Sequence, residues 1–288
     1  CSFPFLLDAA LAARKEELKD VKVRNAISMR PVQVVEQDPE QKAFTFNAWH
    51  CSGLDRKYCD KGLAYYSPML FRDNGLYYSK GYAPVNVAMV TVTPMDKHGY
   101  FTIPLCISHE RTFLAAAKKV IVQVNPNLPR TRGDTALHIR DVDMIVEAAT
   151  PLPYLPKSQP TQVDQAIGQY VASLVNDGDT IQLGIGGIPD AAAMSLMDKH
   201  ELGLHTEMLT NSIVDLIDAG VITNRRKTLH KDRCICTFAL GTQELYDMVD
   251  DNPGVEFYSA SYVNDPRVIG QNDNFVSVNS ALAVDLTG

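Results

Sequence analysis

Short apolar runs alternate with segments of helical spacing along most of this chain. Val85–Val92 and residues 120–124 are nearly continuous apolar runs, which is typical of strands buried on both faces of a parallel sheet. Between them, residues 108–119 have helical composition, with Ser108 as a candidate N-cap. A strand, a helix and a second strand in this order predict a right-handed parallel crossover.

The second half repeats this alternation. Residues 162–176 are predicted to form a helix whose apolar face carries Ala166, Ile167, Tyr170, Val171 and Leu174. The alternation of strands with helices predicts the α/β fold class with open, mainly parallel sheets. Further strands are predicted at 179–183, 202–204, 234–240 and 255–263, and helices at 189–199, 212–219 and 242–249.

The beginning of the chain gives weaker signals. Residues 4–18 have helical spacing, and residues 21–26, 32–35 and 43–47 are predicted to be strands. Residues 49–65 and 74–82 are polar or rich in aromatic residues and glycine, and predict loops.

A proline-rich segment separates the two halves. Residues 151–160 contain four prolines, which sustain neither a helix nor a central strand. This segment predicts a linker between two domains, residues 1–155 and 156–288.

The stretch with the most chemical potential begins where a predicted strand ends at Leu183. A glycine-rich turn follows, and then a helix for which Pro189 suits the first position. Such a turn leaves backbone N–H groups free for an anionic or carbonyl ligand. The next strand delivers Glu207 at its carboxyl end, where ligands bind in parallel sheets. The turn consists of Gly184, Ile185, Gly186, Gly187 and Ile188.

Two chemistries and one purely structural role fit this arrangement. In the first, the turn binds a dinucleotide and Glu207, about 20 residues on, binds its ribose, although Pro189 stands where that fingerprint requires Gly or Ala. In the second, Glu207 is a carboxylate nucleophile beside a carbonyl-binding loop. In the third, the glycines only form a turn and Glu207 is a solvated acid. Spacing alone does not decide among them.

Composition narrows the range of partners. The chain has 288 residues, a net charge of −7 and no large basic cluster, which argues against a nucleic-acid or anionic-membrane partner. No apolar run approaches the length needed to span a bilayer. Six scattered cysteines predict reduced thiols and a cytoplasmic location. Both ends are abrupt, and we expect a piece of a longer protein.

Four segments carry a family resemblance in their order and spacing. They are L-G-I-G-G-I-P-D-A from Leu183, L-G-L-H-T-E-M from Leu202, Y-V-N-D-P-R-V-I from Tyr262 and V-N-S-A-L-A-V-D-L-T-G from Val278. Together they resemble the acetyl-CoA hydrolase/transferase family, and within it the butyryl-CoA:acetate and 4-hydroxybutyrate CoA-transferases.

The resemblance implies two similar α/β domains: an N-terminal CoA-transferase domain over 1–155 and the start of a C-terminal one, incomplete in this chain, over 156–288. It implies that Glu207 is the nucleophile of a ping-pong reaction through a glutamyl-CoA thioester, and that Asn264 holds its carboxylate. The glycine-rich turn at 184–188 corresponds to the family's CoA-binding loop.

The substrates implied are a short-chain acyl-CoA, butyryl-CoA first, and acetate as the acceptor. The alternatives are an acetyl-CoA hydrolase or a 4-hydroxybutyrate CoA-transferase, with an NAD-dependent oxidoreductase as a distant one. The resemblance implies coenzyme A as a substrate, no metal and no tightly bound cofactor, and it is compatible with a homo-oligomer.

Overall fold

The computed structural model describes residues 3–287, and the chain divides into two compact units. The first unit extends from the N-terminal end to Ile103 and includes His109–Leu128 and Ala136–Leu152. The second contains Pro104–Ser108, Pro129–Thr135 and the chain from Pro153 onward. Two short segments of the first half therefore fold with the second unit.

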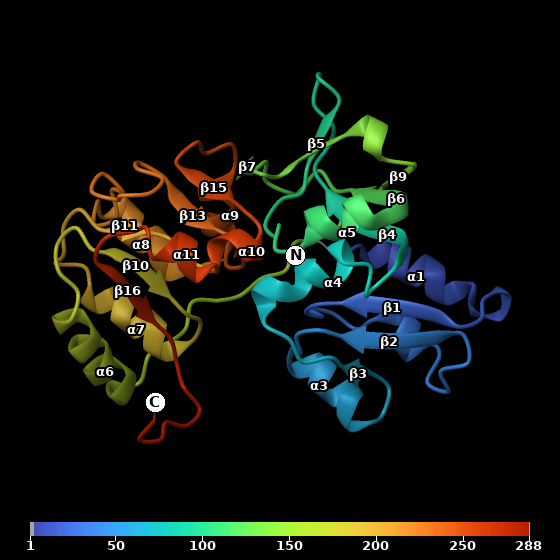
Figure 1. Ribbon diagram of the computed structural model, residues 1–288, viewed down its shortest axis with the longest axis horizontal. Coiled ribbons are helices and arrows are strands. Elements are labelled where there is room, and N and C mark those ends of the chain that lie inside the picture. Colours follow the sequence, from blue (N-terminus) through green and yellow to red (C-terminus); the bar gives the residue numbers. More distant parts are fainter. Residues whose placement is uncertain (1–2, 288) are drawn as a thin grey trace. The chain divides into compact units, whose positions relative to one another are not determined.

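A parallel sheet forms the frame of the first unit. Strands β4 (Val85–Val92), β6 (Ala117–Val124) and β9 (Met144–Glu147) lie side by side in that order, all parallel (Figure 1). Helix α5 (Glu110–Ala116) connects β4 to β6, so the predicted strand–helix–strand order is confirmed. Val90 and Val122 pair across the two strands and are fully buried, as their apolar runs predict.

The rest of the first unit consists of short elements. Strands β1, β2 and β3 form a second parallel sheet, and β5 pairs with β8 in antiparallel fashion. The bounds of the strands are β1 Val21–Asn25, β2 Phe44–Ala48, β3 Tyr65–Tyr66, β5 Tyr100–Thr102 and β8 Ala136–His138. The helices, besides α5, are α1 Phe5–Ala13, α2 Gln33–Glu36, α3 Gly53–Asp60 and α4 Asn74–Ser79.

Three predictions for the beginning of the chain are wrong. Residues 32–35 contribute to helix α2 instead of a strand, because the Asp8 carboxylate accepts the N–H groups of Gln33 and Val34 at 2.6 and 3.4 Å. Residues 49–65 contain helix α3, which Ser52 and Asp55 start with a capping box. Residues 74–82 contain helix α4 instead of a loop.

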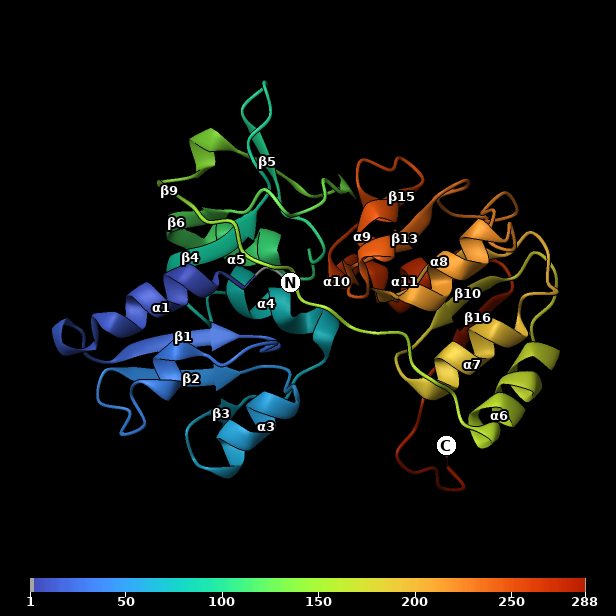
Figure 2. The same ribbon diagram turned by 180° about the vertical axis from the view of Figure 1, so that it is seen from behind.

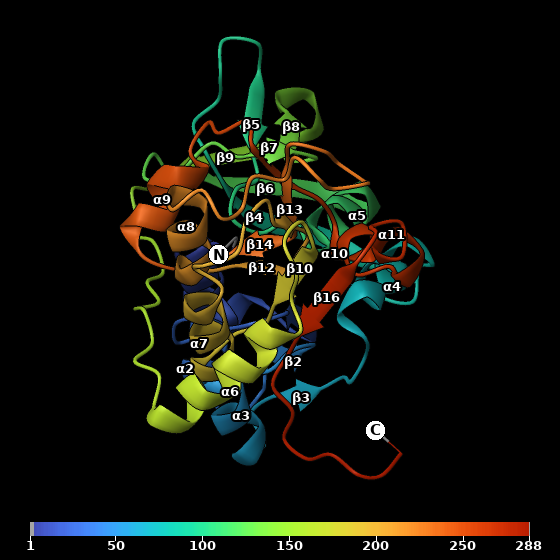
Figure 3. The same ribbon diagram turned by 90° about the vertical axis from the view of Figure 1, so that its left-hand side faces the viewer.

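The named strands of the second unit all pair in parallel. Its strands pair in the orders β11-β10-β16, β13-β15-β7 and β12-β14, and a parallel bridge between His205 and Ile235 connects the first two sets. Figure 3 shows β16 beside β10. The strand bounds are β7 Arg132–Gly133, β10 Thr180–Leu183, β11 Gly203–Leu204, β12 Met208–Leu209, β13 Cys234–Cys236, β14 Phe238–Ala239, β15 Val255–Phe257 and β16 Phe275–Val278.

Helices α6 and α7 of this unit pack against one another along their lengths (Figure 2). A Cβ atom at Gly168 would stand 2.6 Å from the Ala191 carbonyl oxygen, so the two backbones approach closely. The predicted apolar face of α6 is therefore wrong in part: Gly168 and Ala172 are buried and Ile167 and Val171 half-buried, while Tyr170 and Leu174 are 75% and 71% exposed. The helices of the unit are α6 Gln162–Ser173, α7 Gly187–Ser195, α8 Asn211–Asp218, α9 Gln243–Val249, α10 Ala260–Val263 and α11 Pro266–Ile269.

Two predicted strands of this unit are shorter than the sequence suggests. Residues 234–240 divide at Thr237 into β13 and β14, because β13 pairs with β15 whereas β14 pairs with β12. Residues 255–263 form β15 and then α10, for which Ser259 is the N-cap residue. This early turn into α10 brings Asn264 to the end of a helix, where it enters the candidate site.

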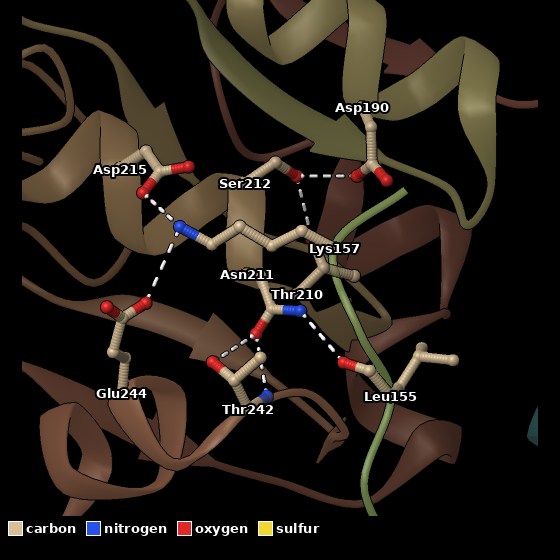
Figure 4. A network of polar contacts seen from close by, with 9 residues as sticks. All are labelled: Leu155, Lys157, Asp190, Thr210, Asn211, Ser212, Asp215, Thr242 and Glu244. Atoms are coloured by element: carbon tan, nitrogen blue, oxygen red, sulfur yellow. Dashed lines mark hydrogen bonds and ion pairs between the residues drawn. The ribbon is translucent and has the colours of Figure 1, made fainter. Parts of the chain in front are cut away.

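The proline-rich segment carries no helix or strand and is anchored to the second unit (Figure 4). The Leu155 N–H group donates to Gly241 O at 3.0 Å, and Leu155 O accepts from the Asn211 side chain at 3.1 Å. Lys157 forms ion pairs with Asp215 and Glu244 at 2.8 and 3.5 Å. These contacts hold residues 155–157 against helices α8 and α9.

Candidate active site

The glycine-rich turn joins strand β10 to helix α7. The Gly184 N–H group donates to Val278 O at 2.8 Å, so it belongs to the sheet and is not free for a ligand. Within residues 3–287, no hydrogen-bond partner is found for the N–H groups of Gly186, Gly187 and Ile188. Helix α7 starts at Gly187, two residues before the predicted start at Pro189, with Gly186 as its N-cap. The turn thus presents free donors at the positive end of a helix.

Gly186 has a backbone conformation that other residues seldom adopt. Its φ and ψ angles are 113° and −174°, a region reached almost only by glycine. We expect Gly186→Ala to cost about 1–3 kcal/mol of local strain, and the turn relieves it by rotating its donors away from the ligand. The KM for the ligand that the turn binds should rise, and this rise, converted to free energy, should exceed the loss in unfolding free energy. Ala193→Gly, later in the same helix, is the control; an equal KM for Gly186→Ala and the parent contradicts a ligand-binding turn.

Glu207 lies just beyond the carboxyl end of β11, next to the strand that precedes the glycine-rich turn. The His205 N–H group donates to Ile181 O at 3.1 Å, and the Thr206 hydroxyl donates to Leu183 O at 3.2 Å. The backbone oxygen of Glu207 accepts the N–H group of Thr237 at 3.0 Å. Because the backbone is held from both sides, the half-buried side chain of Glu207 projects from a fixed point at the strand ends.

Asn264 makes direct contact with Glu207. Its Nδ2 donates to Glu207 Oε2, although the two residues are 57 positions apart in sequence. Asn264 is the C-cap residue of α10, and its own N–H group donates to Ala260 O at 3.0 Å. The structure therefore brings together both residues predicted to be catalytic, and the contact orients one carboxylate oxygen of Glu207.

His205 is buried two residues before Glu207. It is 1% exposed, its Nε2 contacts Val263 O at 2.8 Å, and its ring packs edge-on against Phe275. Since a carbonyl only accepts, Nε2 carries the proton. Among the residues that the structure describes, Nδ1 has no partner. Burial lowers the pKa of His205 from 6.5 to about 4, with a smaller lowering from the charge of Lys227.

The lowered pKa of His205 predicts how the stability of the folded protein changes in acid. The native state keeps the ring neutral down to about pH 4, whereas the unfolded chain protonates it near pH 6.5, so stability falls as the pH drops through this interval. We expect His205→Gln, which does not titrate there, to lose roughly 2–3 kcal/mol less than the parent protein on going from pH 7 to about pH 4.5. Urea unfolding of both proteins at the two pH values measures this difference. Equal losses contradict a neutral buried ring.

Lys227 and Asn224 form hydrogen bonds with the backbone at the end of strand β11. Lys227 is 4% exposed, and its ammonium group donates to Leu204 O and Arg233 O at 2.8 and 2.7 Å. Asn224 Oδ1 accepts the Leu204 N–H group at 2.8 Å. Burial lowers the pKa of Lys227 to about 8. These two side chains fix the backbone from which His205 and Glu207 follow.

A second polar network supports helix α7 (Figure 4). Asp190, in the first turn of the helix, accepts hydrogen bonds from the hydroxyl groups of Ser212, at 2.9 Å, and Ser158. Asn211, at the start of α8, accepts the N–H group of Thr242 at 2.8 Å. The network ties the helix that carries the glycine-rich turn to α8 and to the proline-rich segment.

An open depression of about 840 Å³ in the second unit does not include the candidate site. It is lined by Arg132 and Arg233, which pair with Asp251 and Glu256 respectively. Because acids neutralise both guanidinium groups, the depression offers little free positive charge to a phosphate group. The glycine-rich turn is the better candidate for an anion.

Residues 3–287 contain neither a cluster of metal ligands nor a membrane-spanning helix. No group of three or more His, Cys, Asp or Glu side chains there is arranged to hold a metal ion. No helix in this part of the chain is long and apolar enough to cross a membrane.

The sequence motifs identified some of these residues and missed others. Glu207 and Asn264 lie in contact, and the turn at 184–188 lies at the same ends of the strands, after β10. His205 belongs to the L-G-L-H-T-E-M motif, but the sequence assigns it no role. Only its burial in the structure shows that its side chain faces inward. Lys227 ends the short basic run Arg225–Lys227, which by its composition predicts a solvated segment, and nothing in the local pattern indicates that it is buried.

Family profiles match both ends of the chain. The N-terminal domain profile of acetyl-CoA hydrolase/transferase matches residues 1–156, and the C-terminal domain profile matches residues 241–288. The chain belongs to the acetyl-CoA hydrolase/transferase family.

Individual relatives agree with this assignment. The chain is 43% identical to a succinyl-CoA:cyclohexane-1-carboxylate CoA transferase of Geobacter metallireducens, over 99% of this chain and 64% of the relative. It is 41% identical to a probable butyrate:acetyl-CoA coenzyme A-transferase of Syntrophomonas wolfei, over 98% and 64% respectively. The crystal structure of RipA from Yersinia pestis superimposes with a TM-score of 0.91 at 33% identity, covering 100% of this chain and 69% of RipA. The chain thus spans about two thirds of the length of these proteins.

Proposed function

We propose that this protein transfers coenzyme A from a short-chain acyl-CoA to a carboxylic acid by a ping-pong reaction on Glu207. The observation that carries the proposal is the position of the Glu207 carboxylate, which lies at the strand ends and is oriented by Asn264. Glu207 follows strand β11, and the neighbouring strand β10 leads into the turn with free N–H donors. The names of the relatives, which are CoA transferases, support the same class of reaction.

The chemistry exchanges one thioester for another without loss of its free energy. A Glu207 carboxylate oxygen attacks the thioester carbonyl, and the C–S bond breaks. CoA departs as its thiolate, and the acyl group is now joined to Glu207 in a mixed anhydride. The thiolate then attacks the glutamyl carbonyl, and the first acid departs as its carboxylate. Glu207 now carries CoA as a thioester, and the acceptor acid reverses both steps. A serine nucleophile would form an ordinary ester and lose the activation.

The glycine-rich turn contributes charge stabilisation in this scheme. Each attack on a carbonyl develops negative charge on its oxygen, and the N–H groups of Gly186, Gly187 and Ile188 are donors without a partner in residues 3–287. A donor aimed at such an oxyanion typically contributes ~3–4 kcal/mol. The same donors, at the start of α7, suit the anionic parts of CoA.

The preferred substrates in this proposal are butyryl-CoA and acetate. The name of the Syntrophomonas wolfei relative supports this pair, whereas that of the Geobacter metallireducens relative points to larger acids. Short acids differ by a methylene or a hydroxyl group, which changes selectivity by only ~1–3 kcal/mol. A panel of acyl-CoA donors with acetate, including 4-hydroxybutyryl-CoA, ranks them by kcat/KM.

The proposal includes the two domains predicted from the sequence, residues 1–155 and 156–288. The chain passes from the first compact unit to the second between Leu152 and Pro153, and this supports a boundary in the proline-rich segment. Limited proteolysis of the folded protein tests it, because the first cut should fall near this boundary and give two fragments, separated on a denaturing gel, that each resist further digestion. Rapid digestion of either fragment contradicts the boundary.

Isotope exchange tests the proposed activity. The full-length protein is incubated with butyryl-CoA and labelled acetate, and the proposal expects label in acetyl-CoA. Net release of free CoA without label in acetyl-CoA indicates a hydrolase instead. A thermal shift with NADH, and none with CoA or acyl-CoA, supports the oxidoreductase alternative and overturns the proposal.

A further inference from the structure

We propose that His205 is a positioning residue that holds Asn264 against Glu207. The inference rests on the proposed function, because its effect is a change in the rate of CoA transfer. The five residues involved, with Thr206 between His205 and Glu207, form a closed ring of covalent bonds and hydrogen bonds. His205 precedes Glu207 by two residues and contacts Val263 O, Val263 is bonded to Asn264, and the Asn264 side chain donates to Glu207.

Both the backbone and the ring of His205 are held in place. Its backbone N–H group donates to Ile181 O, and the residue forms a parallel bridge with Ile235, so it sits between two strands of the sheet. Its ring lies 6.1 Å from that of Phe275, at 79° to it. A side chain held in this way presents Nε2 at one point, and the bond to Val263 O transfers that rigidity to α10.

Helix α10 depends on such an outside contact. It has only four residues, Ala260–Val263, so its last carbonyl groups lack partners within the helix. The His205 Nε2–H group satisfies the Val263 carbonyl at 2.8 Å. Without that donor, a buried carbonyl loses its hydrogen bond, and the chain at Val263 and Asn264 shifts to find another. The Asn264 amide then points at Glu207 for a smaller fraction of the time.

The geometry excludes a direct role for His205 in proton transfer. The ring is 1% exposed, and the one nitrogen with a partner donates to a backbone carbonyl. The other nitrogen is buried without a partner among residues 3–287. A neutral ring with its proton on Nε2 satisfies the Val263 carbonyl over the whole neutral pH range, consistent with the lowered pKa that burial gives it.

Two isosteric substitutions separate the donor from the bulk of the ring. The amide nitrogen of glutamine lies as many bonds from Cβ as Nε2 does, and that of asparagine lies as many bonds as Nδ1. We expect His205→Asn to lower kcat about tenfold, which corresponds to about 1.4 kcal/mol, with an acyl-CoA KM within about twofold of the parent. His205→Gln should restore most of the lost kcat. If His205 only filled space, the His205→Asn and His205→Gln variants would not differ in kcat while having the same KM.

A double-mutant cycle with Asn264→Ala tests whether His205 acts through Asn264. The full-length parent, His205→Asn, Asn264→Ala and the double variant are compared by kcat for CoA transfer, with urea unfolding of each as a check on folding. If His205 acts through Asn264, His205→Asn should cost less than about twofold once the Asn264 amide is gone. Equal tenfold losses in both backgrounds overturn the proposal, as does an unchanged kcat in His205→Asn. A parent protein that exchanges no label contradicts the proposed function instead.

Discussion

Glu207→Asp lowers kcat by on the order of 100-fold, because the shorter side chain draws the carboxylate back by one methylene and errors near 1 Å have effects of this size. Glu207→Gln removes the proposed nucleophile, and we expect it to abolish CoA transfer. Both effects are expected in kcat and kcat/KM, since the glutamyl oxygen forms a bond only along the reaction path. Steady-state kinetics with butyryl-CoA and acetate measures them.

Glu16→Asp is the matched control for Glu207→Asp. Glu16 is exposed in the first unit, so shortening it leaves both kinetic constants unchanged. Urea unfolding separates chemistry from folding: neither Glu207 variant should lose more than about 1 kcal/mol, because the side chain is half-buried and its backbone bonds remain. A Glu207→Gln protein that still transfers CoA removes Glu207 from the mechanism.

Asn264→Ala is the second large effect that we expect. The amide donates to one oxygen of Glu207, and without it the carboxylate adopts several rotamers of which only some can attack. We expect kcat to fall about 10- to 100-fold with little change in the acyl-CoA KM, because the contact acts on the nucleophile and not on CoA.

Asn264→Asp sharpens this test. It keeps the shape of the side chain but replaces the donor with a second negative charge against Glu207. At neutral pH its kcat should be at least as low as that of Asn264→Ala. If Asn264→Asp retains the parental rate, the contact between Asn264 and Glu207 has no part in the reaction.

Local patterns predicted those elements whose formation is decided locally. The runs at Val85–Val92 and 120–124 are apolar on both faces, and both are buried parallel strands. Helix α2 is different, because its first N–H groups are capped by Asp8, some 25 residues earlier in the chain. A local pattern contains no information about such a partner. Helix α3 did carry a local signal, the capping box of Ser52 and Asp55.

The candidate site shows the same division. The strand, turn and helix at 180–195 follow from glycine and proline placement, so the turn was predictable to within two residues. The strand-end position singles out Glu207, whereas the choice among its possible roles and the assignment of Asn264 come from the family resemblance; their contact links positions 57 residues apart. His205 and Lys227 are polar residues for which the sequence pattern predicts no buried position. Their burial depends on strands from elsewhere in the second unit, which no local window contains.

Trapping the covalent intermediate tests the central claim most directly. The full-length protein is incubated with butyryl-CoA and no acceptor acid, treated with borohydride, digested and mapped by mass spectrometry. The account predicts that the Glu207 side chain is reduced to the alcohol, with loss of activity, because borohydride reduces a glutamyl thioester and not a free carboxylate. An unmodified Glu207 peptide, in a protein that still transfers CoA after the treatment, would contradict it.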